Sequence, residues 1–180
     1  MTKRLCQGIL RLSGWTLEVT LPDFDKCVIC VAPHTSNWDF IWGKLAYGSL
    51  GRKAGFLMKK EWFFFPLGSL FRAMGGIAVD RKSTSSLTDQ LAERFAHSKR
   101  LSIAITPEAT RKPNRNWKLG FYYIALKAQV PIVLAYIDYK EKRIGLTRAI
   151  VPSGNVERDM DEIKAFYAGR QGKHPENFML

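Results

Sequence analysis

The stretch CVICVAPHTSNWDF, Cys27 to Phe40, joins a short apolar run to a polar turn and then to a mixed segment. An apolar run of this length beside turn residues predicts a buried strand over Cys27–Ala32, and the Thr-Ser-Asn run contains residues that commonly begin helices. The polar residues therefore have a structural explanation, as the start of a helix. They also have a chemical one, in which His34 is a base and Asp39 fixes its orientation.

Short apolar runs and longer amphipathic runs alternate along the rest of the chain. Strands are predicted at Cys27–Ala32, Gly55–Met58, Ile77–Val79, Leu101–Ile105 and Pro131–Ile137. Helices are predicted at Trp38–Tyr47, Phe64–Met74, Ser86–His97 and Gly120–Ala128, and a helix followed by a polar tail at Asp159–Leu180. This alternation predicts an α/β domain with a central mixed, largely parallel sheet flanked by helices.

A chain of 180 residues, of which 46% are hydrophobic, is expected to form one domain with a substantial core. We divide it into an N-terminal amphipathic segment, residues 1–26, and a main domain, residues 27–180. Leu5, Ile9 and Leu12 recur at helical spacing beside basic residues, so this helix either lies on a membrane surface or docks on its own domain. No run of 18 uninterrupted apolar residues occurs, so no transmembrane helix is expected.

The charge balance predicts anionic partners, because 28 Lys and Arg against 16 Asp and Glu give a net charge of +12. An acidic membrane surface and phosphorylated small molecules rank first. No nucleic-acid-binding module accompanies the scattered basic residues, so nucleic acid is not expected as a partner. Three cysteines disfavour a disulfide framework and indicate a reducing compartment, and Cys27 and Cys30 are interpreted as buried strand thiols rather than a redox or metal pair.

His34 and Asp39 can act together only in one local arrangement. On a continuous helix they would lie about 140° apart, so His34 has to sit in the turn while Asp39 lies in the first helical turn. The aspartate then holds one imidazole nitrogen and leaves the other to take a proton from an alcohol. Since no activated nucleophile motif accompanies the pair, direct attack of a substrate hydroxyl on an acyl group is expected.

Two further polar clusters follow predicted strands. In GGIAVDRK, Arg81 suits a phosphate group, although a solvated cation explains it as well. In TPEATRK and the residues after it, Arg111 and Lys118 suit an anion, and Glu108 could accept hydrogen bonds from a glycerol-like hydroxyl beside Thr110. A basic surface loop is the alternative.

Together these clusters resemble the glycerolipid acyltransferase family over roughly residues 28–136. The resemblance rests on His34 and Asp39 with four residues between them, and on GGIAVDR, PEATR and VPIVLAYI in that order. It implies a glycerol-3-phosphate acyltransferase-like fold, with His34 as general base and Asp39 as its orienter. It further implies substrate binding by Lys59, Arg81, Glu108, Thr110, Arg111 and Lys118. Ala109 departs from the family, which has Gly there, and a positive φ at this position would cost of order 1 kcal/mol.

The resemblance implies transfer of a fatty acyl group from acyl-CoA or acyl-carrier protein to a hydroxyl of a lysophospholipid or related lipid. No metal or other cofactor is expected. The protein is expected in the cytoplasm, peripheral on the inner face of the cell membrane, with Trp62–Phe65 as a second membrane contact. Two alternatives remain: a non-catalytic basic module that binds anionic membranes or nucleic acid, and an acyl-thioester hydrolase that uses the same base on water.

Overall fold

Among residues 2–80 and 85–180, which the computed structural model describes, seven strands form one sheet in the order β1-β7-β6-β2-β5-β3-β4. They are β1 (Thr16–Val19), β2 (Lys26–Val31), β3 (Gly55–Lys59), β4 (Gly76–Val79), β5 (Leu101–Ile105), β6 (Ile132–Asp138) and β7 (Arg143–Ile150). Neighbouring strands run parallel, except that β6 and β7 are antiparallel. The predicted α/β class with a mixed, largely parallel sheet is confirmed.

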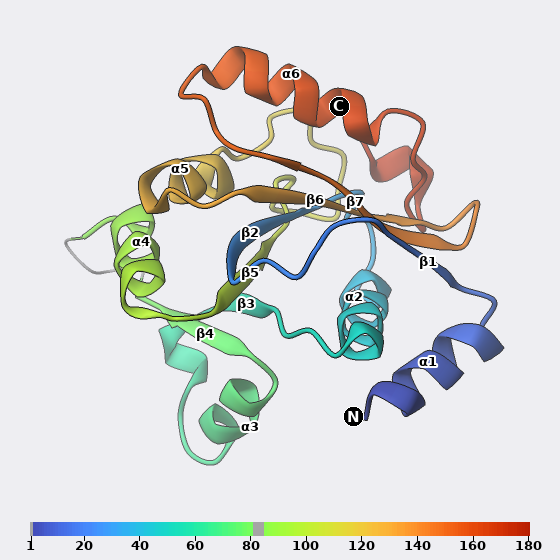
Figure 1. The fold of residues 1–180 in the computed structure, drawn as a ribbon, viewed down its shortest axis with the longest axis horizontal. Helices are drawn as coiled ribbons and strands as arrows, with labels where there is room; N and C mark the ends of the chain where they lie inside the picture. Colours follow the sequence, from blue (N-terminus) through green and yellow to red (C-terminus); the bar gives the residue numbers. More distant parts are fainter. Residues whose placement is uncertain (1, 81–84) are drawn as a thin grey trace.

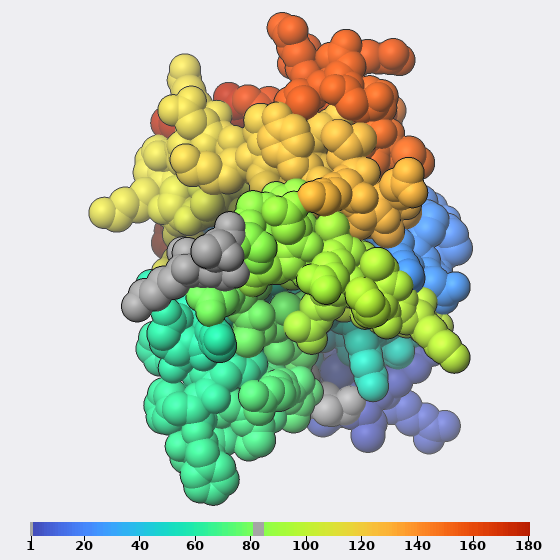
Figure 2. All heavy atoms as spheres, turned by 90° about the vertical axis from the view of Figure 1, so that its left-hand side faces the viewer, coloured from blue at the N-terminus to red at the C-terminus, as the bar shows by residue number. Residues whose placement is uncertain are grey.

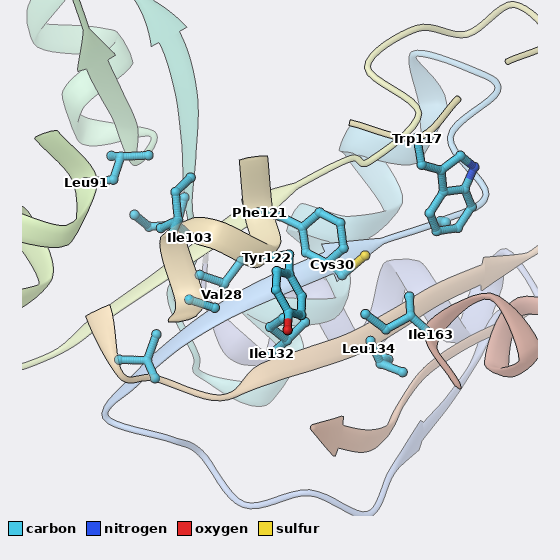
Figure 3. Packing of buried hydrophobic residues seen from close by; sticks show 14 of the residues in the cluster. Val28, Cys30, Leu91, Ile103, Trp117, Phe121, Tyr122, Ile132, Leu134 and Ile163 are labelled. Atoms are coloured by element: carbon cyan, nitrogen blue, oxygen red, sulfur yellow. The ribbon is translucent and has the colours of Figure 1, made fainter. Parts of the chain in front are cut away.

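Helices lie on both faces of this sheet (Figure 1). They are α1 (Lys3–Leu12), α2 (Trp38–Leu50), α3 (Leu67–Ala73), α4 (Leu87–His97), α5 (Gly120–Ala128) and α6 (Val156–Tyr167), with 3-10 turns at Lys60–Trp62 and Pro175–Asn177. Successive residues of β2 serve opposite faces, because side chains alternate along a strand. Val28 and Cys30 pack in the cluster that Phe121 of α5 and Ile163 of α6 complete (Figure 3). Ile29 packs on the other face, beside α2.

Two additional strands and the starting residues of two helices differ from the prediction. The strands β1 and β7 were not predicted, although they pair with each other at one end of the sheet. The helix expected at Phe64–Met74 begins only at Leu67, directly after Pro66, because proline is tolerated at the start of a helix but not in its interior. The last helix begins at Val156 rather than at Asp159, since the Asn155 side chain caps it by accepting from Arg158 N.

Helix α1 docks on the rest of the domain. Cys6 and Leu10 are buried, and Cys6 lies so close to Gly48 of α2 that a β-carbon there would meet its sulfur at 2.7 Å. Of the two sequence alternatives for this helix, docking is confirmed, while Leu5 and Leu12 stay exposed. The division of the chain at residue 26 stays a prediction. No described helix has both the length and the apolar character needed to cross a membrane.

The sheet brings the polar clusters together. Strand β2 lies between β6 and β5 and runs parallel to both, so the loops after these three strands leave from the same edge. The turn containing His34 follows β2, and the loop containing Glu108 follows β5. His34 and Glu108, which are 74 positions apart in sequence, are thereby placed next to each other.

Candidate active site

The turn between β2 and α2 is held by a single carboxylate. Asp39 Oδ2 accepts hydrogen bonds from the backbone N of Thr35 and of Ser36, each at 2.9 Å. Both amides lie in the turn just before the N-cap residue Asn37, which makes no side-chain cap of its own. Asp39 therefore folds the turn back onto the first turn of α2. This is the arrangement that the sequence predicted would be needed for His34 and Asp39 to meet.

This fold brings the two predicted catalytic side chains into contact. His34 Nδ1 lies 3.2 Å from Asp39 Oδ2, and the side chains are 18% and 2% exposed respectively. Because the carboxylate engages Nδ1, it favours the tautomer in which Nδ1 carries the proton and Nε2 is the free base. A buried carboxylate beside the ring also stabilises the imidazolium that forms when Nε2 takes up a proton.

A third side chain, Tyr139, completes the contacts of the aspartate. Its hydroxyl donates to Asp39 Oδ1 at 2.7 Å, and its ring packs edge-on against Trp15 with centroids 5.1 Å apart. Burial and the adjacent carboxylate raise the pKa of Tyr139 above its ordinary value, so the hydroxyl keeps its proton and acts as a donor. Sequence reasoning missed this residue, because nothing in the pattern after β6 marks a tyrosine that reaches back 100 residues.

Glu108 fixes the backbone of the turn between β2 and α2, residues 32–37, which we call the catalytic turn because it carries the predicted base His34. The residue is 1% exposed, and its Oε1 accepts a hydrogen bond from His34 N at 2.6 Å. Burial raises the pKa of the Glu108 carboxyl to about 7, although the hydrogen bond from His34 acts in the opposite direction. The predicted role of Glu108 in binding an acceptor hydroxyl stays a prediction.

The next residue, Ala109, adopts a left-handed backbone conformation with φ of 55°. This is the position where the resemblance implied glycine, and the positive φ explains why glycine suits it. The alanine methyl is accommodated in an exposed part of the loop.

His34 lines a cavity of about 970 Å³, a volume that lies at the upper end of the range for small-molecule sites. Most of its wall is apolar and comes from α2, β3 and β5, including Trp38, Phe40, Ile41, Phe56, Leu57 and Ile105. Lys44, Arg111 and Lys118 also line it, so three cations stand beside a largely apolar space. A cavity of this kind accepts a long apolar group together with an anionic one.

Of the other predicted substrate-binding residues, neither Lys59 nor Thr110 belongs to this wall. Lys59 is exposed at the end of β3, and Thr110 Oγ1 accepts from the backbone N of Lys112 at 3.2 Å. Arg81 lies outside the described residues. The roles assigned to these three residues stay predictions.

The cysteines occupy the strand positions predicted for them. Cys27 and Cys30 are free and buried in β2, and burial raises the pKa of the Cys30 thiol to about 12. A thiol in that environment is a poor nucleophile, since the thiolate is the reactive form. Attack by a substrate group is therefore the simpler chemistry at this site.

Comparison with known proteins places this arrangement in a family. The family model described as Acyltransferase matches residues 17–138, which include His34, Asp39 and Glu108. The chain belongs to the acyltransferase family. The stated resemblance to glycerolipid acyltransferases is confirmed by this match together with the names of the curated relatives described next.

Several curated acyltransferases are similar in sequence. The 1-acyl-sn-glycerol-3-phosphate acyltransferase of Escherichia coli (strain K12) is 29% identical over 126 residues, 67% of this chain and 50% of that protein. The enzyme of the same name from Haemophilus influenzae is 29% identical over 147 residues, 76% of this chain and 60% of that protein. The chain thus spans between half and three fifths of these two relatives.

A solved structure shares the fold of this acyltransferase-family chain. The crystal structure of the 1-acyl-sn-glycerophosphate (LPA) acyltransferase PlsC from Thermotoga maritima matches with a TM-score of 0.61 and 17% sequence identity. The match covers 91% of this chain and 74% of that one. At this identity the likeness supports the architecture and not the chemistry.

Proposed function

We propose that this chain is an O-acyltransferase that moves a fatty acyl group from acyl-CoA or acyl-carrier protein to a hydroxyl of a lysophospholipid or related lipid. The observation that carries the proposal is the contact of His34 with buried Asp39 at the wall of a large apolar cavity. The names of its relatives, 1-acyl-sn-glycerol-3-phosphate acyltransferases, point to the same chemistry.

In the proposed reaction, His34 Nε2 removes the proton of the acceptor hydroxyl as its oxygen attacks the thioester carbonyl. Asp39 stabilises the imidazolium through Nδ1. The tetrahedral intermediate then collapses, the carbon–sulfur bond breaks, and the imidazolium returns its proton to the departing thiolate. The products are an ester and a free thiol, and the sequence of steps needs no metal ion, no prosthetic group and no covalent acyl-enzyme.

The cavity suggests how the substrates are held. Its apolar wall suits a fatty chain, whose burial is favourable by about 0.8 kcal/mol for each methylene. Arg111 and Lys118 suit the phosphate of an acceptor or of the donor, with Arg81, Lys59 and Thr110 as further residues implied by the family resemblance.

An exposed apolar surface supports a peripheral position on an anionic membrane. We define the α3 patch as the exposed apolar side chains between β3 and β4: Trp62, Phe64, Phe65, Leu67, Leu70 and Met74. Phe65 is 92% exposed, and Lys59 and Lys60 flank the patch. This segment forms the lower end of the molecule in Figure 2, and helix α1 lies toward the same end (Figure 1). Aromatic side chains with adjacent lysines are typical of surfaces that insert into the headgroup region of an acidic bilayer. We place that bilayer at the cytoplasmic face of the cell membrane.

The test is product analysis. Purified protein is incubated with acyl-CoA or acyl-carrier protein and a panel of lysolipids, with and without a phosphate, and the lipids are identified by mass. The proposal expects a lipid that has gained one acyl group for each thiol released. Release of thiol and free fatty acid without an acylated lipid would instead identify a hydrolase, and no turnover of either donor would contradict the enzymatic proposal.

A further inference from the structure

The segment after α6 lies directly on the catalytic turn, although it falls outside the residues 17–138 that match the family. The backbone N of His174 donates to Thr35 Oγ1 at 3.1 Å, and Thr35 is 3% exposed. Gly172 approaches the same side chain so closely that a β-carbon would lie 2.5 Å from Thr35 Oγ1. Only glycine allows the backbone to pass at this distance. Residue 35 is also one of the two whose amides fold the turn onto Asp39.

The same segment holds Tyr139. The backbone N of Tyr139 donates to Gln171 O at 2.8 Å, and the Tyr139 hydroxyl donates to Asp39 Oδ1 at 2.7 Å. The two oxygens of Asp39 therefore have different partners. Oδ2 serves Thr35, Ser36 and His34, while Oδ1 accepts from Tyr139.

Further along, the chain reaches the loop that carries Glu108. Met179 O accepts a hydrogen bond from the indole of Trp117 at 2.9 Å, and Phe178 packs against the same indole. Residues 171–179 thus connect β6, the catalytic turn and the glutamate loop along one edge of the sheet. We call this segment the C-terminal strap.

We infer that Tyr139 and the C-terminal strap position the His34–Asp39 pair for proton transfer, an inference that rests on the proposed acyltransferase function. Tyr139 fixes the carboxylate through Oδ1, and the strap fixes both Tyr139 and Thr35. Neither makes contact with the cavity, since none of Tyr139, Gln171, Gly172 and His174 lines it. Their loss is expected to slow the chemical step and to leave substrate binding largely unchanged.

Tyr139→Phe tests the first contact, because it removes the hydroxyl and keeps the ring that packs on Trp15. The hydroxyl donates to an ionised carboxylate, and hydrogen bonds of this kind are shorter and stronger than those between neutral groups. We expect kcat for acyl transfer to fall about tenfold or more, with KM for both substrates within about twofold of the wild type. Tyr123→Phe is the matched control, since Tyr123 is 43% exposed on α5 and does not line the cavity. It is expected to leave kcat unchanged.

Gly172→Ala tests the strap, because the added methyl forces it away from Thr35. Gly8→Ala is its control, since a β-carbon at Gly8 in α1 meets nothing within 4 Å. We expect kcat to fall several-fold in Gly172→Ala and to be unaffected in Gly8→Ala. Near-UV circular dichroism establishes whether each variant is folded. If Gly172→Ala does not fold, the kinetics of Tyr139→Phe alone test the positioning role.

The outcomes separate this inference from the proposed function. If the wild type transfers acyl groups and Tyr139→Phe keeps a kcat within twofold, or loses activity through KM alone, the positioning role is wrong and the proposed function stands. If the wild type transfers no acyl group to any acceptor, the proposed function is contradicted, and the inference that rests on it is contradicted too.

Discussion

The Glu108 carboxylate accepts a hydrogen bond from the backbone N of His34 at 2.6 Å, although 74 residues separate the two along the chain. This bond ties the loop after β5 to the turn after β2, which are neighbouring parallel strands. The two polar clusters that looked separate in the sequence are therefore parts of one structure. A glutamate that is buried while holding the turn of the base has a structural reason to be there, in addition to any contact with substrate.

The raised pKa of Glu108 predicts that the stability of the protein depends on pH. Its pKa is about 7 in the folded protein against an ordinary value of 4.5, so between these pH values the folded chain holds a proton that the unfolded chain has lost. The stabilisation is complete below pH 4.5 and disappears as the pH rises through 7. In Glu108→Gln, whose amide oxygen can still accept from His34 N, this dependence is absent. The difference in the free energy of unfolding, wild type minus Glu108→Gln, should therefore fall by on the order of 3 kcal/mol as the pH rises from 4.5 to above 7.

Urea denaturation of both proteins at several pH values from 4.5 to 7.5 measures this difference. Glu157→Gln, which removes an exposed carboxylate of α6, is the matched control. A difference between wild type and Glu108→Gln that stays constant or grows with rising pH would show that Glu108 is ionised in the folded protein throughout.

Ala109 offers a stabilising substitution. Its φ of 55° is costly for a residue with a β-carbon, by about 1–2 kcal/mol, whereas glycine adopts it readily. Ala109→Gly should therefore raise the free energy of unfolding by about 0.5–1 kcal/mol, because the greater entropy of glycine in the unfolded chain offsets part of the gain. Ala165→Gly, at an exposed position inside α6, is the control and should lower it by about 1 kcal/mol. Thermal unfolding measures both, and equal destabilisation by the two substitutions would argue against strain at Ala109.

The α3 patch can be tested without disturbing the core. Phe65 is 92% exposed, so Phe65→Glu should fold normally but place a negative charge against an acidic bilayer. Burial of a Phe side chain contributes about 1.5–3 kcal/mol, so we expect binding to vesicles of mixed zwitterionic and anionic phospholipid to weaken about tenfold or more. Co-sedimentation measures the binding.

Val151→Glu is the matched control, because Val151 is 78% exposed after β7 and lies outside the α3 patch. It changes the net charge of the protein by the same amount. If the two substitutions weaken vesicle binding equally, net charge alone explains the attraction and the α3 patch is not the docking surface.

The strands that the sequence predicted correctly are those with strong, continuous apolar character. The central strands β2, β5 and β6 show this pattern because helices cover both faces of the sheet there. The missed strand β7 carries Arg143, Thr147 and Arg148 among its apolar residues, since part of it is exposed. Its Gly145 breaks the pattern further, because a β-carbon there would meet the Tyr136 ring at 2.2 Å.

The site was predictable where it depends on local spacing and unpredictable where it depends on the sheet. Spacing alone indicated that His34 and Asp39 meet only across a turn, and the structure has that turn. By contrast, Glu108 contacts a backbone amide, which leaves no trace in the types of side chain. Tyr139 and the C-terminal strap reach the turn from the far end of the chain, and the strap appeared in the sequence only as a polar tail.

The kinetics of His34→Ala measure the central claim most directly, with acyl transfer from acyl-CoA to lysophosphatidate followed by mass in wild type and variant. His34 is partly exposed and the polar contact of its ring is with Asp39, so the variant should remain folded. Removal of a general base typically costs a factor of about 10²–10⁴, and we predict a fall in kcat of this size with vesicle binding unchanged. A folded His34→Ala protein whose kcat stays within a few-fold of the wild type would contradict the account.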